Sequence, residues 1–139
     1  MTFIRKNAEP EKFWNKLVRD KVPHICHGQG LITVTRGLGD REYLKELRRK
    51  VREEKAEYRA AVETQDRLEE LADILEVTVA IRNVLGEINA VKRLILFIRK
   101  EREKLSVSVA HLEQVRKKKA NERGAFNDRI FLISTKGAQ

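Results

Sequence analysis

Cysteine, proline and aromatic residues are scarce in this sequence. Cys26 is the only cysteine, so a disulfide within the chain and a zinc site built from cysteines are excluded, and a reducing cytoplasm is the expected compartment. Two prolines, seven glycines and 6% aromatic residues argue against a β-sandwich or barrel. No apolar run is long enough to span a membrane, and the first ten residues carry charges where a signal peptide would be apolar. We therefore expect a soluble cytoplasmic protein.

The abundant residues favour long amphipathic helices. With 41% apolar and 37% charged residues, the 139-residue chain has enough apolar surface for a core and enough charge for exposed helix faces. The composition excludes an all-β fold, and the length predicts a single domain over residues 1–139. Together with the helices indicated by apolar periodicity below, we expect an all-α fold, a bundle of three to four helices.

Charge is distributed unevenly along the chain. Residues 1–81 hold 16 basic and 15 acidic residues, whereas residues 82–139 hold 14 basic and 6 acidic ones. Residues 53–76 contain nine acids and three bases. An acidic block in a chain of net charge +9 suits a divalent cation that is bound to a polyanion. The acids would bind the cation, and nearby basic groups would bind the polyanion.

The two ends of the chain are expected to contribute little regular structure. Residues 1–39 are predicted to be irregular because Pro23 and several glycines punctuate them, except for an alternating run at residues 32–35 that predicts a strand. The apolar run at residues 128–134 predicts a second strand. We expect these two segments to pair as a short two-stranded β element.

Apolar periodicity predicts two long helices in the centre. Apolar residues at three- and four-residue steps predict a first helix over residues 41–61, with Asp40 as its N-cap. The one gap in its apolar stripe is Glu54, which we expect to point inward; the alternative is a single acid that reaches water at the edge of the stripe. A second helix, over residues 67–85, is apolar around nearly its whole circumference and is expected to be buried.

The first turns of this second helix carry acids that need a cationic partner. Burial costs a carboxylate roughly several kcal/mol of hydration free energy, which a partner must compensate. No matching excess of basic residues lies on the same helix, so either a third element supplies basic groups or the partner is a metal ion. These acids fall on one sector of the helix: Glu69, Glu70, Asp73 and Glu76.

A third, basic helical region follows. Apolar residues at near-heptad spacing predict it over residues 88–112. The β-branched run at residues 106–109 either continues this helix or ends it, with Ser106 or Ser108 as the N-cap of a fourth helix. Gly124 is expected to end the helical region.

The central acids form two motifs at helical spacing. Glu53-Glu54-x-x-Glu57 lies on the first helix and Glu70-x-x-Asp73 on the second, with twelve residues between them. Residues three apart share a helix face, so two antiparallel helices would bring one carboxylate pair opposite the other. Four oxygen ligands and no soft ones favour Mg²⁺, with Mn²⁺ as a substitute, over zinc or copper.

Two further segments accompany these motifs. Residues 15–23 read NKLVRDKVP, and residues 118–130 read KKANERGAFNDRI. The EExxE and ExxD motifs resemble the signature of the all-α NTP pyrophosphohydrolases, the MazG-like superfamily. This superfamily includes dimeric dUTPases and phosphoribosyl-ATP pyrophosphohydrolase. The two end segments resemble the NKLVRDKIP opening and the KxxERGGFxxRI closing segment of one of its branches. Three motifs in order are more specific than acidic pairs alone, which charged helices contain by chance.

The resemblance implies an enzyme that hydrolyses nucleoside triphosphates between the α and β phosphates, as a homodimer or higher oligomer, to remove damaged or surplus nucleotides. It implies that Glu54, Glu57, Glu70 and Asp73 bind Mg²⁺. Glu53 and Glu54 are the catalytic candidates, Glu53 to orient or deprotonate the attacking water, although it points roughly 100° away from Glu54 on the helix. Basic residues of the two end motifs are the candidates for phosphate contacts: Lys16, Arg19, Lys21, Lys119 and Arg123.

Some features depart from that family. Residues 86–112 are longer than the helix, loop and helix expected in this branch, an extension that would alter the oligomer or cover the site. Ala80 stands where some relatives have an Asn, and Glu76 is an additional acid. The sequence therefore leaves the base and sugar open, and a phosphoribosyl-nucleotide substrate stays open too.

Other interpretations compete with the enzyme. Residues 116–119 (RKKK) indicate either a nucleic-acid patch in the basic C-terminal part or a solvated helix face, and no aromatic residues are interleaved among them. A structural helical bundle that oligomerises without activity is the third interpretation. The His24-Ile25-Cys26-His27 run offers three metal ligands without a fourth, and His111 is expected at a surface or interface.

Overall fold

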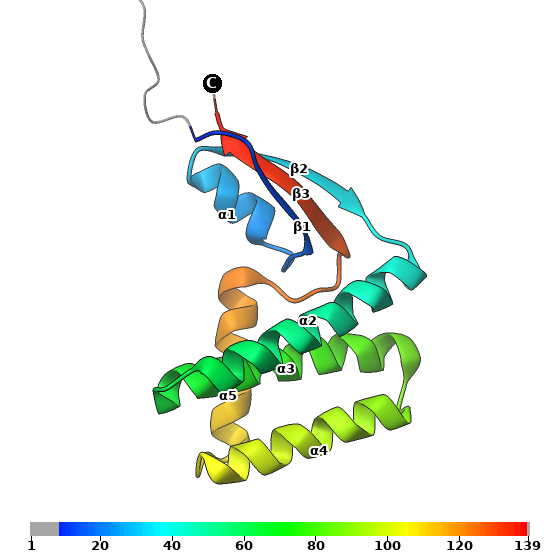
Figure 1. The fold of residues 1–139 in the computed structure, drawn as a ribbon, viewed down its shortest axis with the longest axis vertical. Coiled ribbons are helices and arrows are strands. Elements are labelled where there is room, and N and C mark those ends of the chain that lie inside the picture. Colours follow the sequence, from blue (N-terminus) through cyan, green and yellow to red (C-terminus); the bar gives the residue numbers. More distant parts are fainter. Residues whose placement is uncertain (1–8, 139) are drawn as a thin grey trace, which may run out of the picture.

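The structure is a computed structural model that describes residues 9–138. Four consecutive helices form one half of the molecule, and a small sheet with a short helix forms the other (Figure 1). The elements follow in the order β1 (Lys12–Leu17), α1 (Val22–Gly28), β2 (Leu31–Gly37), α2 (Asp40–Ala60), α3 (Thr64–Leu85), α4 (Asn89–Lys104), α5 (Val109–Arg123) and β3 (Ile130–Gly137).

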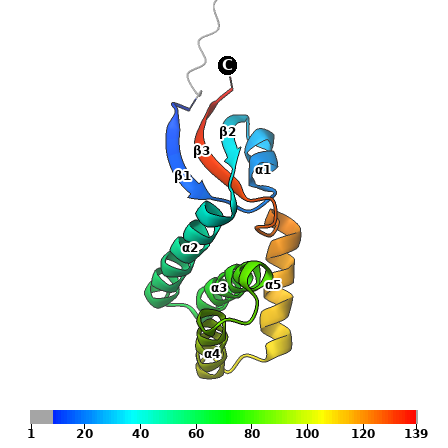
Figure 2. The ribbon, with the colours of Figure 1, turned by 90° about the vertical axis from the view of Figure 1, so that its right-hand side faces the viewer.

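The three strands form one antiparallel sheet in the order β1-β3-β2. The last strand of the chain therefore lies between the first two, and its register includes Lys12 opposite Thr135 in β1 and Leu31 opposite Gly137 in β2. A register shift follows Phe13, where Asn15 adopts a left-handed conformation with φ 47°. Helix α1 lies beside β2 (Figure 2).

Helix α3 is the centre of the helical half. It runs antiparallel to α2 after a turn at residues 61–63, and α4 and α5 also pack against it (Figures 1 and 2). Because these helices pack around α3, most of its apolar residues are buried within one chain. Among the described residues, none of the helices combines the length and hydrophobicity needed to cross a bilayer.

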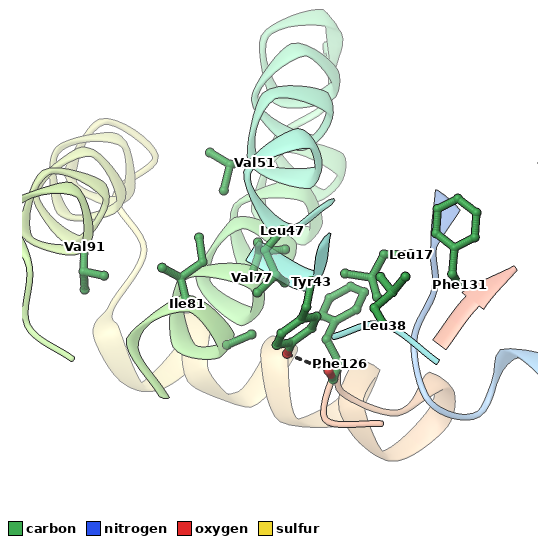
Figure 3. Close-up of a cluster of buried hydrophobic side chains, with 11 residues drawn as sticks. Leu17, Leu38, Tyr43, Leu47, Val51, Val77, Ile81, Val91, Phe126 and Phe131 are labelled. Atoms are coloured by element: carbon green, nitrogen blue, oxygen red, sulfur yellow. Dashed lines mark hydrogen bonds between the residues drawn. The ribbon is translucent and has the colours of Figure 1, made fainter. Parts of the chain in front are cut away.

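Two apolar clusters stabilise these halves. The first joins the sheet to α2 and α3, and Figure 3 shows the Tyr43 hydroxyl directed at the Phe126 carbonyl, to which it donates a 2.7 Å hydrogen bond. The second fills the far end of the bundle, where Tyr58 of α2 meets Leu71 of α3, Ile98 of α4 and Leu112 of α5. The carboxylate motifs of α2 and α3 lie on helices that both clusters hold in place.

The predicted long helices are confirmed, with small changes at their ends. The described residues nevertheless form five helices and a sheet, so the expected all-α bundle of three to four helices is confirmed only as a mostly helical fold. α3 begins at Thr64, three residues earlier than expected. The break at residues 105–108 is real, since Ser108 caps α5 by accepting a 3.1 Å hydrogen bond from the His111 amide. Gly124 ends α5 with φ 86°. Asp40 as N-cap of α2 is wrong, because its carboxylate pairs with Arg129 and Gly39 takes the N-cap position.

The prediction of an irregular N-terminal segment is wrong for much of its described part. β1 escaped detection because the register shift near Asn15 breaks its alternation, and its partner strand lies at the other end of the chain. α1 has only seven residues, too few for a periodic apolar pattern, and Pro23 opens it rather than breaking it. The predicted pairing of residues 32–35 with residues 128–134 is confirmed within β2 and β3, but the β element has three strands rather than two.

Candidate metal and phosphate site

Three carboxylates converge where α2 and α3 face each other. Glu54, Glu57 and Glu70 each place a carboxylate oxygen within 4.8 Å of the other two. Glu54 and Glu57 share a face of α2, and α3 brings Glu70 opposite them. The Oε2 atoms of Glu54 and Glu70 are buried and have no hydrogen-bond partner among the described residues. Buried carboxylate oxygens without donors are costly, so this cluster fits a cation from outside the chain.

Without a cation, the surroundings of the cluster favour protonated acids. Burial raises the pKa of Glu54 to about 9, and the neighbouring carboxylates add to this rise. Burial also raises the pKa of Glu70. A divalent cation reverses this preference, because it stabilises the ionised carboxylates that bind it. A donor set made only of oxygens suits Mg²⁺ or Mn²⁺.

Asp73, the fourth predicted metal ligand, is bound to cations of the protein itself. Its carboxylate accepts hydrogen bonds from Arg19 and from Lys119, each 2.8 Å long. One turn further along α3, the buried Glu76 accepts a 2.8 Å hydrogen bond from Arg116. The first alternative from the sequence, basic groups supplied by other elements, is therefore found for Asp73 and Glu76. Glu70 has no such basic partner among the described residues.

The two end motifs of the sequence meet beside this site. The Asp20 carboxylate accepts hydrogen bonds from the amides of Asn127 (3.0 Å) and Asp128 (2.9 Å). Gly124, in the C-terminal motif, has φ 86°, and a Cβ atom on it would lie 2.8 Å from the backbone nitrogen of Lys21 in the N-terminal motif. Only glycine fits this crossing without displacing backbone, so the two end motifs form one structural unit.

A pocket of about 450 Å³ opens between the sheet, α1 and the α2–α3 pair. Its volume lies within the roughly 300–1,000 Å³ of small-molecule sites. Glu54 belongs both to the carboxylate cluster and to the pocket lining, and Asp73 lines the same side. No residue of α4 lines it, so the extended region does not cover this pocket. Five basic residues line the same pocket: Lys12, Lys16, Arg19, Lys50 and Arg123.

Trp14 organises the basic side of the pocket. The ammonium groups of Lys12 and Lys16 lie 3.9 and 4.9 Å from the centre of its indole ring. Its indole N–H donates a 3.0 Å hydrogen bond to the Thr135 hydroxyl of β3. Sequence analysis missed Lys12 and Trp14 because β1 was not predicted, and alternation of lysine with tryptophan near residue 14 was the available signal.

Lys50 is a second basic residue that sequence analysis missed. It lies one turn before Glu54 on α2 and lines the same pocket. Burial lowers the pKa of Lys50, and the nearby glutamates partly oppose that change. Its position at i−4 from Glu54 on the inward face of α2 was the signal that could have identified it.

The remaining predicted site residues lie in different places. Lys16, Arg19 and Arg123 line the pocket. Lys21 is exposed and donates a 2.6 Å hydrogen bond to the Asn121 carbonyl, and Lys119 reaches the site only through Asp73. Glu53 lies outside the carboxylate cluster and pairs with Arg49 at 3.3 Å.

The other candidate ligands do not form a second metal site. His24, Cys26 and His27 lie on α1, where His27 shares a 3.2 Å hydrogen bond with Thr33, and the residues described contain no cluster of metal ligands there. His111 is exposed in the first turn of α5.

The basic run of α5 is divided between inside and outside. Arg116 and Lys119 point inward to Glu76 and Asp73, whereas Lys117 and Lys118 line a shallow surface pocket. Only half of the predicted nucleic-acid patch is therefore available at the surface.

Comparison with protein-family models, with curated proteins and with solved structures found no match for this chain.

Proposed function

We propose that this chain is a Mg²⁺-dependent nucleoside triphosphate pyrophosphohydrolase, which cleaves between the α and β phosphates to give a nucleoside monophosphate and pyrophosphate. One observation carries the proposal: Glu54 joins a carboxylate cluster with buried, unpartnered oxygens to a pocket lined by five basic side chains. A triphosphate with its cation carries both charges that such a site complements. The sequence resemblance to the MazG-like superfamily supports the same activity.

In this proposal Glu54, Glu57 and Glu70 hold the cation. When bound, Mg²⁺ supplies charge neutralisation at the phosphates and lowers the pKa of a coordinated water. Glu54 is the carboxylate that faces both the cluster and the pocket, so it is the residue placed to contact the attacking water. Glu53 is paired with Arg49 and lies outside the carboxylate cluster, so in this proposal any effect of Glu53 on the attacking water is indirect.

The basic lining binds the phosphates. Arg19 supplies a guanidinium whose forked N–H donors match phosphate oxygens, and Lys12 and Lys16 supply point charges from β1. Because Arg19 and Lys119 now neutralise Asp73, phosphate competes with that carboxylate for the same cations. A phosphate that binds these cations releases Asp73 toward the neighbouring cluster, so substrate and metal are expected to bind cooperatively.

The rest of the pocket suits the nucleoside. Its apolar lining comes from the sheet, from α1 and from Phe126, and it can cover a base and sugar. The resemblance further implies a cytoplasmic homodimer that removes damaged or surplus nucleotides, and light scattering on the purified chain tests the dimer.

Product analysis tests the activity. The purified chain is incubated with Mg²⁺ and a panel of ribo- and deoxynucleoside triphosphates, and pyrophosphate is scored separately from orthophosphate. We expect pyrophosphate from the wild type, at least a hundredfold less from Glu70→Gln, and nearly wild-type amounts from Glu69→Gln, whose side chain lies outside the cluster. Orthophosphate as the sole product, or equal activity in the two variants, would contradict the proposal.

A further inference from the structure

One flank of α2 carries a continuous row of basic residues. They follow one another at alternating steps of four and three, so at about 100° per residue they share an arc of about 80°. The row extends over nearly the whole helix, a length of about 27 Å at 1.5 Å per residue. Its members are Arg41, Lys45, Arg48, Arg52, Lys55 and Arg59.

The acids of α2 lie elsewhere on the helix. Glu42, Glu46, Glu53 and Glu57 point at least about 60° away from the edge of this arc, and Glu54 is on the inward side. The helix therefore has a basic flank and an acidic flank. The acidic flank contributes Glu57 to the carboxylate cluster. Apart from the contact of Lys55 with Phe97, no ion pair or ring contact involves the basic flank among residues 9–138.

The basic row is exposed and lacks ion pairs. Arg41, Lys45, Arg48, Arg52 and Arg59 are all exposed, and none forms an ion pair within residues 9–138. Arg49, which lies about 40° outside the arc, is by contrast paired with Glu46 and Glu53.

Such a row is unfavourable for an isolated helix. Like charges at i, i+3 and i, i+4 repel one another, and solvated helix faces commonly alternate in sign. Every successive pair in this row is a like-charge pair. An external polyanion removes this repulsion, because it places negative charge along the whole row.

Helix α4 widens the basic surface. Phe97 of α4 contacts α2, since its ring lies 4.5 Å from the Lys55 ammonium and packs edge-on against Tyr58. Arg93 and Lys100 are exposed on α4 within about 60° of Phe97, and neither has an ion pair among the described residues. α2 lies at one edge of the helical half (Figure 2), and five of the six side chains of its basic row are exposed.

We propose that the basic flank of α2, widened by Arg93 and Lys100, binds the sugar–phosphate backbone of a nucleic-acid duplex without reading its sequence. Four of the six residues in the row are arginines, whose forked donors suit phosphate. Among the described residues, no exposed aromatic side chain on which single-stranded bases would stack lies on α2 or α4. Leu96 is the one exposed large apolar side chain on these two helices, and a single leucine is too little for insertion into a membrane. The carboxylate cluster lies on another side of α2, so a bound duplex leaves that site open.

Fluorescence anisotropy with a labelled 20-base-pair DNA duplex of random sequence tests this inference on the full chain. The triple variant Arg48→Gln, Arg52→Gln, Arg59→Gln is compared with Lys92→Gln, Lys117→Gln, Lys118→Gln, which removes the same charge from exposed positions outside the row. We expect the row variant to lose at least tenfold in affinity at 50 mM salt and to lower the slope of log K against log[salt] by roughly three, with a clearly smaller loss in the control.

Melting curves keep the test independent of folding, since relief of like-charge repulsion should leave the row variant at least as stable as the wild type. No binding of duplex by the wild type would overturn the inference. Equal losses in the two triple variants would also overturn it, because the attraction would then depend on net charge alone. Tighter binding to a single strand or to phosphatidylserine vesicles than to the duplex would identify a different partner and likewise overturn it.

Discussion

Arg19 and Asp73 lie 54 positions apart in the sequence, and their side chains meet in an ion pair 2.8 Å long between the loop after β1 and helix α3. The same guanidinium donates a 2.9 Å hydrogen bond to the Gly124 carbonyl. One side chain thus connects the N-terminal motif, the C-terminal motif and the carboxylate helix. Because Arg19 is only 8% exposed, this connection is shielded from water.

Loss of this connection should destabilise the fold. Arg19→Gln leaves a largely buried carboxylate with only Lys119 as partner, and removal of one member of a buried pair costs roughly 3–5 kcal/mol. We expect a loss near the lower end of that range in urea unfolding, because Lys119 remains. Arg99→Gln, which breaks an exposed pair with Glu103, should change the free energy of unfolding far less. Equal losses would show that the Arg19 contacts are no stronger than surface pairs.

Local signals explain what the sequence could predict. The helices follow from apolar periodicity, and the inward position of Glu54 follows from its place in the apolar stripe of α2. The meeting of Glu54, Glu57 and Glu70 follows from three-residue spacing on two helices with a short turn between them. Each of these inferences needs only residues that are close in sequence.

Long-range pairings explain what the sequence could not predict. Nothing local shows that Arg19 and Lys119 would neutralise Asp73 while Glu70 stays without a partner, since those cations arrive from opposite ends of the chain. The same holds for β1, whose hydrogen bonds go to β3. The pocket depends on both pairings, so its lining could be predicted only in part.

Gly124 should tolerate no side chain. Gly124→Ala places a Cβ atom 2.8 Å from the Lys21 nitrogen and 3.0 Å from Asp20, at φ 86°. Backbone strain of this kind costs roughly 1–3 kcal/mol, and we expect a lower melting temperature by several degrees. Gly28→Ala is the matched control, because a Cβ atom there meets nothing within 4 Å. Similar stability of the two variants would show that the crossing of the two end motifs can relax.

Divalent cations should stabilise the protein through the carboxylate cluster. At roughly 100 times its Kd a ligand contributes about 2.7 kcal/mol, so Mg²⁺ should raise the melting temperature by several degrees. Glu70→Gln removes a ligand and should abolish this rise, whereas Glu69→Gln should retain it. A rise that survives Glu70→Gln would place the cation elsewhere.

The metal-free protein should lose stability as the pH rises. The folded pKa of Glu54 is about 9, above its ordinary value of 4.5, so between these values the folded chain holds a proton that the unfolded chain has released. The free energy of unfolding measured in EDTA should therefore fall from pH 5 to pH 9. Glu54→Gln should flatten this dependence. A profile for Glu54→Gln as steep as that of the wild type would assign the effect to other groups.

Trp14 is the only tryptophan in the sequence, so its fluorescence reports on the pocket. Phosphate that draws Lys12 and Lys16 away from the indole ring should change its emission, and titration with pyrophosphate should give a saturable signal. If phosphate also takes Arg19 and Lys119 from Asp73, Mg²⁺ should tighten pyrophosphate binding by roughly tenfold, within the usual range of coupling between sites. Asp73→Asn should reduce that gain, whereas Lys117→Gln on the exposed side of α5 should keep it. Equal pyrophosphate affinity with and without Mg²⁺ in the wild type would show that Asp73 is a structural partner of Arg19 and not a ligand that phosphate releases.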